Sequence, residues 1–367
     1  MKNRMKLIAF HLPQFHSFPE NDEWWGEGFT EWDNVKKAVP LFKGHAQPKI
    51  PKDQQYYSML DVNILKKQTE LAQVYGIDGF CYYHYWFNGK LLMERPLELL
   101  LQHKEIRQDF CLCWANEPWT RSWDGKSGTV LIAQDYGKQD DWERHFQYLF
   151  SFFQDPRYIK VEGSPVLLIY RTNNIPVLDE MLTYWKTRCR ECGFEGVYII
   201  EEKNYYQREA ASRISDAVMD FEPMFTLKYG RSIFQKIVWR LHSEWLDRKY
   251  HTSVRFYSYD LIWKLIIKRK QAKGKNKCIR SAFVDWDNTP RRKGRGIVFR
   301  GGSPEKFEKY LTELVRISCL ENQRFLFINA WNEWAEGAYL EPDESNGFAY
   351  LEAVAHVRKK IEQEMVK

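Results

Sequence analysis

Short apolar segments alternate with longer amphipathic segments along almost the whole chain. The short segments are nearly continuous hydrophobic runs, which are typical of parallel strands covered on both faces. The longer segments repeat apolar residues at helical spacing, as Leu65, Leu71, Ala72 and Tyr75 show in the first of them. The predicted strands are residues 6–10, 79–85, 110–114, 166–170, 197–201, 217–221, 282–286 and 325–330.

The predicted helices lie between these strands and after the last one. They cover residues 62–75, 96–105, 141–153, 178–192, 304–318 and 348–363. Eight strands separated by mostly helical segments predict an α/β fold, the (β/α)8 or TIM barrel. We expect residues 1–367 to form a single barrel domain that carries the active site.

One connection is too long for a simple crossover. It covers residues 228–277, between the sixth and seventh strands, and its apolar periodicity predicts two helices at 233–249 and 257–269. A basic run follows at 268–277. Beside Trp263 and the aliphatic residues after it, this run would suit contact with an anionic membrane surface. A solvated surface segment is the alternative for this helical, basic insertion.

Polar and aromatic side chains follow nearly every predicted strand. In a barrel of this type the C-terminal ends of the strands meet on one face, and the active site lies there. The residues that we expect to contact a ligand are His11, Gln14, Trp25, Glu27, Glu31 and Trp32 after the first strand, Tyr83, His84 and Trp86 around the end of the second, Asn116, Glu117, Trp119 and Arg121 after the third, Glu222 after the sixth, Asp285 and Asn288 around the end of the seventh, and Trp331, Asn332 and Trp334 after the eighth.

The segment after the eighth strand carries the most informative chemistry. It contains Glu333 and Glu336, flanked by Trp331 and Trp334. A turn would bring the two carboxyls into one pocket with indole walls. Cleavage of a glycosidic bond needs one carboxyl to protonate the leaving oxygen and another to activate the attacking group. We therefore expect Glu333 and Glu336 to be catalytic, with the more desolvated carboxyl keeping its proton at neutral pH.

Composition agrees with a carbohydrate cleft and disfavours other classes. The 15 Trp and 21 Tyr have polar tips that suit a wide, partly wet cleft. A formal charge of +6 is too small to indicate nucleic-acid binding. The sequence has no G-x-S-x-G elbow, no phosphate-binding glycine loop and no zinc-finger spacing. We expect an oligo- or polysaccharide substrate, no nucleic-acid partner, no metal and no cofactor.

The cysteines and the N-terminal segment bear on location. Seven cysteines, an odd number in mostly apolar or helical segments, favour reduced thiols. The apolar run near the N-terminus is too short for a signal peptide, and no run reaches the length of a membrane span. We expect a cytoplasmic protein, with peripheral contact to the inner face of the membrane through the basic insertion as the alternative to a free one.

Four motifs resemble the WbsX-like proteins of bacterial surface-polysaccharide gene clusters. They are FHLPQFH at 10–16, WWGEGFTEW at 24–32, FCYYHYW at 80–86 and WNEWAEG at 331–337. The last motif also resembles glycoside hydrolase family 99, the endo-α-mannosidases. The resemblance implies a (β/α)8 barrel with a role in O-antigen (lipopolysaccharide) or capsule glycans, and WbsX-like proteins are commonly labelled glycosyltransferases.

The family 99 resemblance also implies roles for the two glutamates. Glu333 would deprotonate the 2-hydroxyl of the sugar, which then attacks its own anomeric carbon to give an epoxide-like intermediate. Glu336 would act as general acid and then as general base. A preference for α-mannosides is not implied, because the likeness to the hydrolases is weaker outside this motif.

Several functions remain open at this point. The favoured one is retaining cleavage, or transglycosylation, of a bacterial surface polysaccharide or its precursor. A glycosyltransferase is the second, since the Asp-Trp-Asp sequence at 285–287 matches the D-x-D of metal-dependent transferases. In a third, Asn-Glu-Pro at 116–118 resembles the acid/base motif of the large retaining clan, so that Glu117 would be the acid and Glu333 or Asp285 the nucleophile. The fourth is a non-catalytic glycan-binding barrel.

Overall fold

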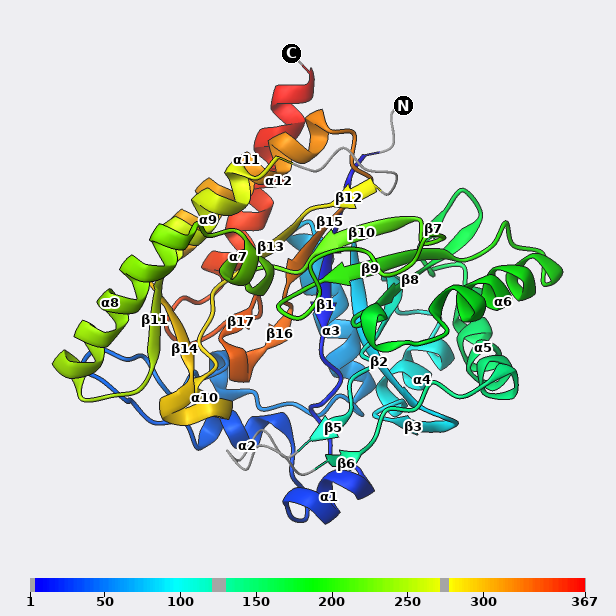
Figure 1. Ribbon diagram of the computed structural model, residues 1–367, viewed down its shortest axis with the longest axis horizontal. Coiled ribbons are helices and arrows are strands. Elements are labelled where there is room, and N and C mark those ends of the chain that lie inside the picture. The colour runs from blue at the N-terminus through cyan, green and yellow to red at the C-terminus, as the bar shows by residue number, and fades with distance from the viewer. Residues whose placement is uncertain (1–3, 121–129, 271–276, 367) are drawn as a thin grey trace.

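Parallel strands form the centre of the molecule, and helices surround them (Figure 1). The structure is a computed structural model and describes residues 4–120, 130–270 and 277–366. The strands of the central sheet are β1 (Lys6–His11), β2 (Gly79–Phe87), β4 (Asp109–Trp114), β8 (Ser164–Ile169), β9 (Tyr198–Lys203), β10 (Ala217–Asp220), β12 (Lys277–Ile279), β13 (Ser281–Phe283) and β15 (Phe325–Asn329), with β3 (Lys90–Leu92) and β7 (Lys160–Val161) at its margin.

The sheet closes on itself. Its strand order is β12-β10-β9-β8-β4-β2-β1-β15-β13, and the pairs along this path are parallel. β12 and β13 are consecutive pieces of one strand, parted by Arg280, so the two ends of the order meet. The predicted (β/α)8 barrel is confirmed. The seventh strand differs from its predicted bounds of 282–286, because it starts at Lys277 and ends at Phe283.

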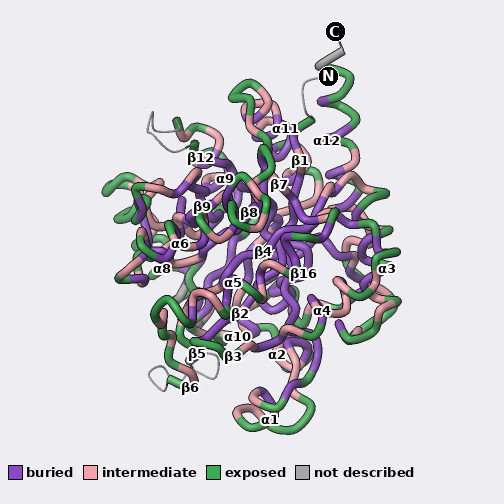
Figure 2. Tube along the Cα trace, turned by 90° about the vertical axis from the view of Figure 1, so that its right-hand side faces the viewer, coloured by how far each residue is buried: buried purple, intermediate pink, exposed green. Residues whose placement is uncertain are grey.

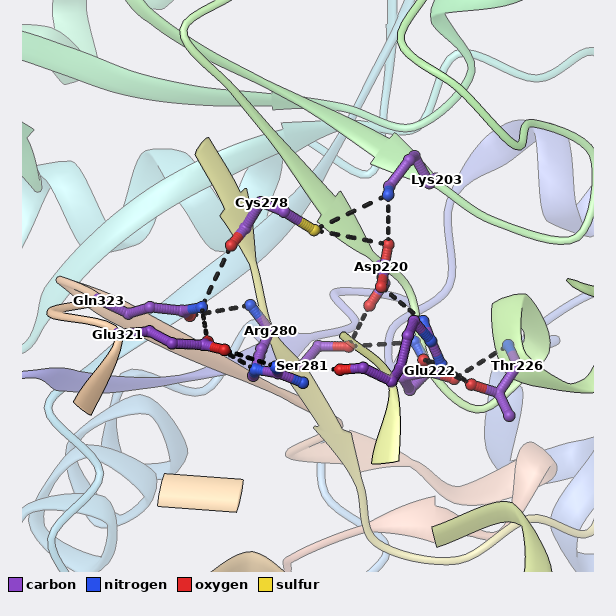
Figure 3. A network of polar contacts seen from close by, with 10 residues as sticks. Lys203, Asp220, Glu222, Thr226, Cys278, Arg280, Ser281, Glu321 and Gln323 are labelled. Atoms are coloured by element: carbon purple, nitrogen blue, oxygen red, sulfur yellow. Dashed lines mark hydrogen bonds and ion pairs between the residues drawn. The ribbon is translucent and has the colours of Figure 1, made fainter. Parts of the chain in front are cut away.

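Side-chain hydrogen bonds connect the sixth and seventh strands beside the break between β12 and β13 (Figure 3). The Ser281 hydroxyl donates to the Asp220 carbonyl and accepts from the Glu222 backbone N–H at 3.1 Å. Arg269 forms ion pairs with both Asp220 and Glu222, the latter at 2.6 Å. The Glu222 side chain, predicted to contact a ligand, is buried in this network and does not line the cavity described below.

The six predicted helices are present around the barrel. Their buried faces continue the core of the strands, and Figure 2 shows the buried trace running through the centre of the molecule. The helices are α1 (Pro19–Trp25), α2 (Glu31–Lys36), α3 (Val62–Val74), α4 (Arg95–Gln102), α5 (Gln139–Phe153), α6 (Leu178–Glu191), α7 (Met224–Tyr229), α8 (Ile233–Tyr250), α9 (Tyr259–Lys268), α10 (Thr289–Arg292), α11 (Pro304–Leu320) and α12 (Ala349–Val366).

The connection between the sixth and seventh strands is helical, as predicted. α7, α8 and α9 follow one another there, and β11 (Arg255–Ser258) pairs in parallel with β14 (Ile297–Arg300). Trp263 and Ile266 are buried in the core, where Trp263 stacks on Phe283, so they are not on the membrane-facing surface that the sequence suggested. Most of the basic run, residues 271–276, lies outside the described residues.

Candidate active site

A cavity of about 830 Å³ opens on the face of the barrel where the strands end. The end of every barrel strand, or the loop directly after it, contributes to the lining. Enzymes with this fold bind their substrates at this face. One lining residue from each strand, in chain order, is Leu12, Tyr83, Ala115, Tyr170, Tyr205, Phe221, Trp286 and Asn329.

The loop after β15 turns sharply and presents both candidate catalytic carboxyls to this cavity. β16 (Asn332–Glu333) and β17 (Ala338–Tyr339) form a hairpin joined by a single 3-10 turn, and Glu333 and Glu336 both line the cavity. Gly337 follows the turn with a φ of 65°, and a Cβ atom there would lie 2.8 Å from the Asp287 backbone nitrogen. A side chain at Gly337 would therefore disturb the turn that carries the acids.

Arg291 of α10 holds three carboxylates at once. Its Nε lies 2.7 Å from Glu31 Oε1, its Nη1 2.8 Å from Glu336 Oε1 and its Nη2 3.0 Å from Glu333 Oε2. The guanidinium is planar and rigid, so its donors fix the carboxylates relative to each other. The Glu31 side chain is fully buried, whereas that of Glu336 is 23% exposed. Arg291 thus joins the α2, α10 and β15 loops at one end of the barrel (Figure 1).

Burial sets the protonation of this group. It raises the pKa of Glu333 to about 8, against the opposing charge of Arg291, and the Glu336 and Glu31 carboxylates raise it further. Burial also raises the pKa of Glu31, again opposed by Arg291. One guanidinium charge therefore offsets only part of the cost of three acids in a low-dielectric site. At neutral pH, Glu333 holds a proton for most of the time in the free protein.

Trp331 and Trp334 do not form walls of the cavity. Both are buried, and their indole N–H groups donate to the Glu341 carboxylate at 3.1 and 2.6 Å. The Tyr57 hydroxyl and the Gln68 amide donate to the same carboxylate, each at 2.7 Å. These four hydrogen bonds fix the loop after β15 to the core. The tryptophans therefore stabilise the position of Glu333 and Glu336 and do not contact the cavity. Glu341 was not identified from the sequence.

Two asparagines fix neighbouring strand-end loops to each other. The Asn332 side chain accepts from the Leu12 N–H at 2.7 Å and donates to the Leu12 carbonyl at 3.0 Å. Asn116 forms the same pair of bonds with Arg171, at 2.7 and 2.9 Å. Each amide side chain thus takes the place of a backbone partner. Both residues act on the geometry of the site without lining the cavity.

The other predicted site residues divide by position. Those that line the cavity are Gln14, Tyr83, Glu117, Trp119, Asn288, Glu333 and Glu336. Those that do not line it are His11, Trp25, Glu27, Glu31, Trp32, His84, Trp86, Asn116, Glu222, Asp285, Trp331, Asn332 and Trp334. Arg121 lies outside the described residues.

Packing explains several of the displaced residues. His84 lies 2.8 Å from His145 between their Nε2 atoms, and Trp86 stacks on the same ring. Burial lowers the pKa of His84, and of His11, to about 3, so both are neutral core residues. Glu27 is exposed beyond the end of α1, which lies at the margin of the molecule (Figures 1 and 2).

The Asp-Trp-Asp sequence does not present two carboxylates to the cavity. The Asp287 carboxylate accepts hydrogen bonds from His45 at 2.8 Å, from Gln47 at 2.7 Å and from the Thr289 hydroxyl and N–H. Asp285 accepts from the N–H of Trp286 and does not line the cavity. In the described parts of the chain, no three His, Cys, Asp or Glu side chains are grouped so that they could hold a metal ion.

The basic residues of the described cavity lining were not identified from the sequence. Arg291 is the most important of them, and Arg171, which forms an ion pair with Glu117 across the lining, is another. A signal was present, because the Thr-Pro-Arg-Arg segment at 289–292 follows the seventh strand directly. Arginines in such positions are usually solvated, so the sequence alone did not single them out.

Comparison with known proteins gives the family. The family model described as "Glycosyltransferase WbsX" matches residues 7–354. This chain belongs to the WbsX family. The WxcX proteins of two strains of Xanthomonas campestris pv. campestris are each 35% identical to it over 352 residues, which is 95% of this chain and 48% of theirs. The chain therefore spans about half the length of the curated relatives it matches.

Solved structures share the fold of this WbsX family member. The family 99 endo-α-mannosidase of Bacteroides thetaiotaomicron superposes with a TM-score of 0.55 at 13% identity, covering 98% of both chains. A protein described as glycoside hydrolase-like gives a TM-score of 0.58 at 12% identity, covering 97% of this chain and 95% of its own. At such identities the likeness shows the fold alone, which is the (β/α)8 barrel.

Replacing Arg291 should destabilise the folded protein. In Arg291→Gln, three carboxyls lose their shared cation, and leaving buried charges unpaired costs about 3–5 kcal/mol. We expect the free energy of unfolding at pH 8, from urea denaturation followed by tryptophan fluorescence, to fall by about that amount. Arg292→Gln, at the exposed neighbouring position, is the matched control and should change it by less than about 0.5 kcal/mol. Equal stability of both variants would contradict the role given to Arg291.

Proposed function

We propose that this WbsX family member is a glycoside hydrolase or transglycosylase that cleaves a bacterial surface polysaccharide, or its precursor, with retention of configuration. One observation carries the proposal: Glu333 and Glu336 line the same cavity and bind the same guanidinium. Two adjacent carboxyls of unequal burial are what proton transfer to and from a glycosidic bond requires. Residues 1–367 would act as one catalytic domain, with 228–277 as an insertion.

The unequal burial supports a division of roles. Glu333 would take a proton from the 2-hydroxyl of the sugar, and a pKa of about 8 makes its carboxylate a stronger base than an ordinary glutamate. Glu336 would protonate the leaving oxygen and then activate water. Its partly exposed side chain suits the second step, in which a water molecule must approach.

Glycosyl transfer is the second candidate, and the family description favours it. A transferase would use the same cavity to bind a sugar nucleotide. Two further alternatives keep the cavity but change the chemistry: Glu117 as acid/base, which its place in the lining permits, and a binding protein without turnover. Substrate conversion and variants of the glutamates separate these alternatives.

Loss of either glutamate should abolish most of the turnover. We expect Glu333→Gln and Glu336→Gln each to reduce it at least about 100-fold, the lower end for general acid–base catalysis. The measurement is mass spectrometry of O-antigen and capsule glycans after incubation with protein alone and then with sugar nucleotides. Shorter oligosaccharides from protein alone, absent with the variants, are the expected result.

Three comparisons make this experiment decisive. Glu195→Gln, an exposed position away from the cavity, should retain full activity. A loss confined to Glu117→Gln would transfer the acid role to Glu117. Products that lengthen only when a sugar nucleotide is present would establish transfer and refute cleavage.

The pH dependence follows from the role of Glu333. As a base it acts only when ionised, so kcat/KM should rise with pH and level off above about pH 8, falling about tenfold for each unit below that. In Glu333→Gln the residual activity should lose this limb, while Glu195→Gln should keep it. A wild-type kcat/KM that decreases through pH 8 would instead make Glu333 the proton donor.

We also propose that the insertion contacts an anionic membrane surface through α8. Its apolar residues lie on one side of the helix and are 43–79% exposed. They are Ile233, Phe234, Ile237, Val238, Leu241 and Trp245. Lys236, Arg240 and Lys249 lie along the same helix, which is the composition of a helix that rests in a bilayer interface.

The expected cytoplasmic location remains a prediction, as does this contact. Among the helices of residues 4–120, 130–270 and 277–366, none is long and apolar enough to cross a membrane. An interfacial helix requires no such span. The bilayer fits α8 better than a second copy of the chain would, because a second copy would bring the same basic residues together.

Vesicle binding tests the role of α8. We expect the protein to sediment with phosphatidylcholine vesicles that contain a third of phosphatidylglycerol, and Phe234→Ser with Leu241→Ser to weaken this binding at least about tenfold. Val74→Ser with Leu320→Ser removes two equally exposed apolar side chains elsewhere and should have no effect. Wild-type protein that stays in solution, or that forms a dimer which the α8 substitutions abolish, would refute the membrane contact.

A further inference from the structure

The lining of the cavity is unusually basic. Among the described residues, the lining includes eight basic residues and three acidic ones, Glu117, Glu333 and Glu336. Neutral sugars are bound by hydrogen bonds and flat apolar surfaces and need no excess of positive charge. The eight basic residues are Arg171, Lys228, Arg231, Lys236, Arg255, Arg291, Arg292 and Arg295.

Four of these residues belong to the insertion, and we call them the basic wall: Lys228, Arg231, Lys236 and Arg255. Lys228 lies in α7, Arg231 between α7 and α8, Lys236 in the first turn of α8 and Arg255 in β11, whereas Glu333 and Glu336 come from the loop after β15. Within the described residues, none of the four forms an ion pair with a carboxylate. The acids and the unpaired cations thus occupy different parts of one cavity.

The side chain of Arg231 is held in position by its neighbours, unlike that of a freely solvated surface arginine. Its Nε donates to the Leu227 carbonyl at 2.7 Å, and its guanidinium carbon lies 4.9 Å and 5.2 Å from the ring centres of Trp239 and Tyr257. These contacts hold the guanidinium in place without neutralising it. Burial lowers the pKa of Arg231, which reflects the cost of removing an unpaired cation from water.

Comparable arginines elsewhere in the barrel are neutralised. Each of four arginines whose side chains are at most 20% exposed has a carboxylate partner, as buried charges generally do. The pairs are Arg157 with Asp155, Arg269 with Glu222, Arg280 with Glu321, and Arg358 with Asp78. Arg231 is half-buried and lines the cavity, where a ligand could supply the anion that the described residues do not.

We propose that the basic wall binds an anionic group of the substrate, a carboxylate or a phosphate, so that the enzyme acts on an acidic glycan. Guanidinium groups bind both anions in a bidentate manner, and a cleft lined by cations concentrates such ligands. Lys228, with its Nζ 4.6 Å from the Tyr205 ring centre, adds a second charge beside an aromatic surface. This inference rests on the proposed function, since it names the class of glycan that the cavity accepts.

Binding by Glu336→Gln, which should not turn its ligand over, tests the proposal directly. The probes are native acidic O-antigen and capsule polysaccharides, and the same polymers after reduction of their carboxyl groups to alcohols or removal of their phosphates. Carboxyl reduction turns each uronic acid into the corresponding neutral sugar, and only phosphates that are side substituents are removed, so each pair keeps its linkages and differs at the acidic group. We expect the acidic form to bind about 10- to 100-fold more tightly, as charge-assisted hydrogen bonds predict, and high salt to reduce the difference.

Variants of the basic wall test whether it causes the tighter binding of the acidic form. Arg231→Gln and Lys228→Gln, each added to Glu336→Gln, should weaken binding of the acidic form about tenfold and leave the neutral form unchanged. Arg107→Gln, an exposed position outside the cavity, is the matched control and should have no effect. Equal binding of acidic and neutral forms, or no binding of either, would overturn the proposal.

The outcomes also separate this proposal from the proposed function. Acidic glycans that bind but are not cleaved by the wild type would support the basic wall and refute hydrolysis. Equal cleavage of neutral and acidic glycans would support hydrolysis and refute the role of the basic wall. UDP-glucose is a third probe: tight binding that requires Arg231, with none by acidic glycans, would assign the wall to the diphosphate of a sugar donor and overturn the acidic glycan.

Discussion

Three carboxyl groups share one guanidinium at the centre of this site, and the rest of the cavity is arranged around that contact. Glu31 begins α2, about 300 residues before the loop that carries Glu333 and Glu336, yet each of the three lies within 3.0 Å of an Arg291 nitrogen. Without the cation, burial and mutual repulsion would protonate the acids or separate them. The single charge of Arg291 offsets only part of the cost of burying three carboxylates. That incompleteness raises the pKa of Glu333, the more deeply buried member of the pair that lines the cavity.

The surrounding residues restrict the movement of this group. Asn332 fixes the β15 loop to the backbone after β1, and Glu341 collects the two indole N–H groups of Trp331 and Trp334 beneath it. Gly337 allows the loop to turn against Asp287 without a side chain in the way. The packing of the tryptophans and the hydrogen bonds of Asn332 and Glu341 therefore both hold the two acids at a fixed distance from Arg291.

The sequence was sufficient for the barrel, because strands covered on both faces leave long apolar runs such as 325–330. It also led to Glu333 and Glu336, whose spacing requires a turn if both are to face one pocket. It failed where a residue's role depends on partners distant in the chain. Trp331 and Trp334 have the composition of a sugar-binding surface, but their indole N–H groups reach Glu341 in the core. Arg291 has no local pattern that distinguishes it from a solvated arginine.

The family description names glycosyl transfer, and the charges of the cavity bear on whether transfer or cleavage takes place there. A diphosphate leaving group departs as a stable anion, so a transferase benefits from cations and needs no general acid for that group. A glycosidic oxygen is a poor leaving group and must receive a proton. Burying three acids around Arg291 costs desolvation free energy. Transfer from a sugar nucleotide would not require this arrangement. The basic wall alone would suit either reaction, but an acidic glycan cleaved by the acid pair accounts for both halves of the cavity.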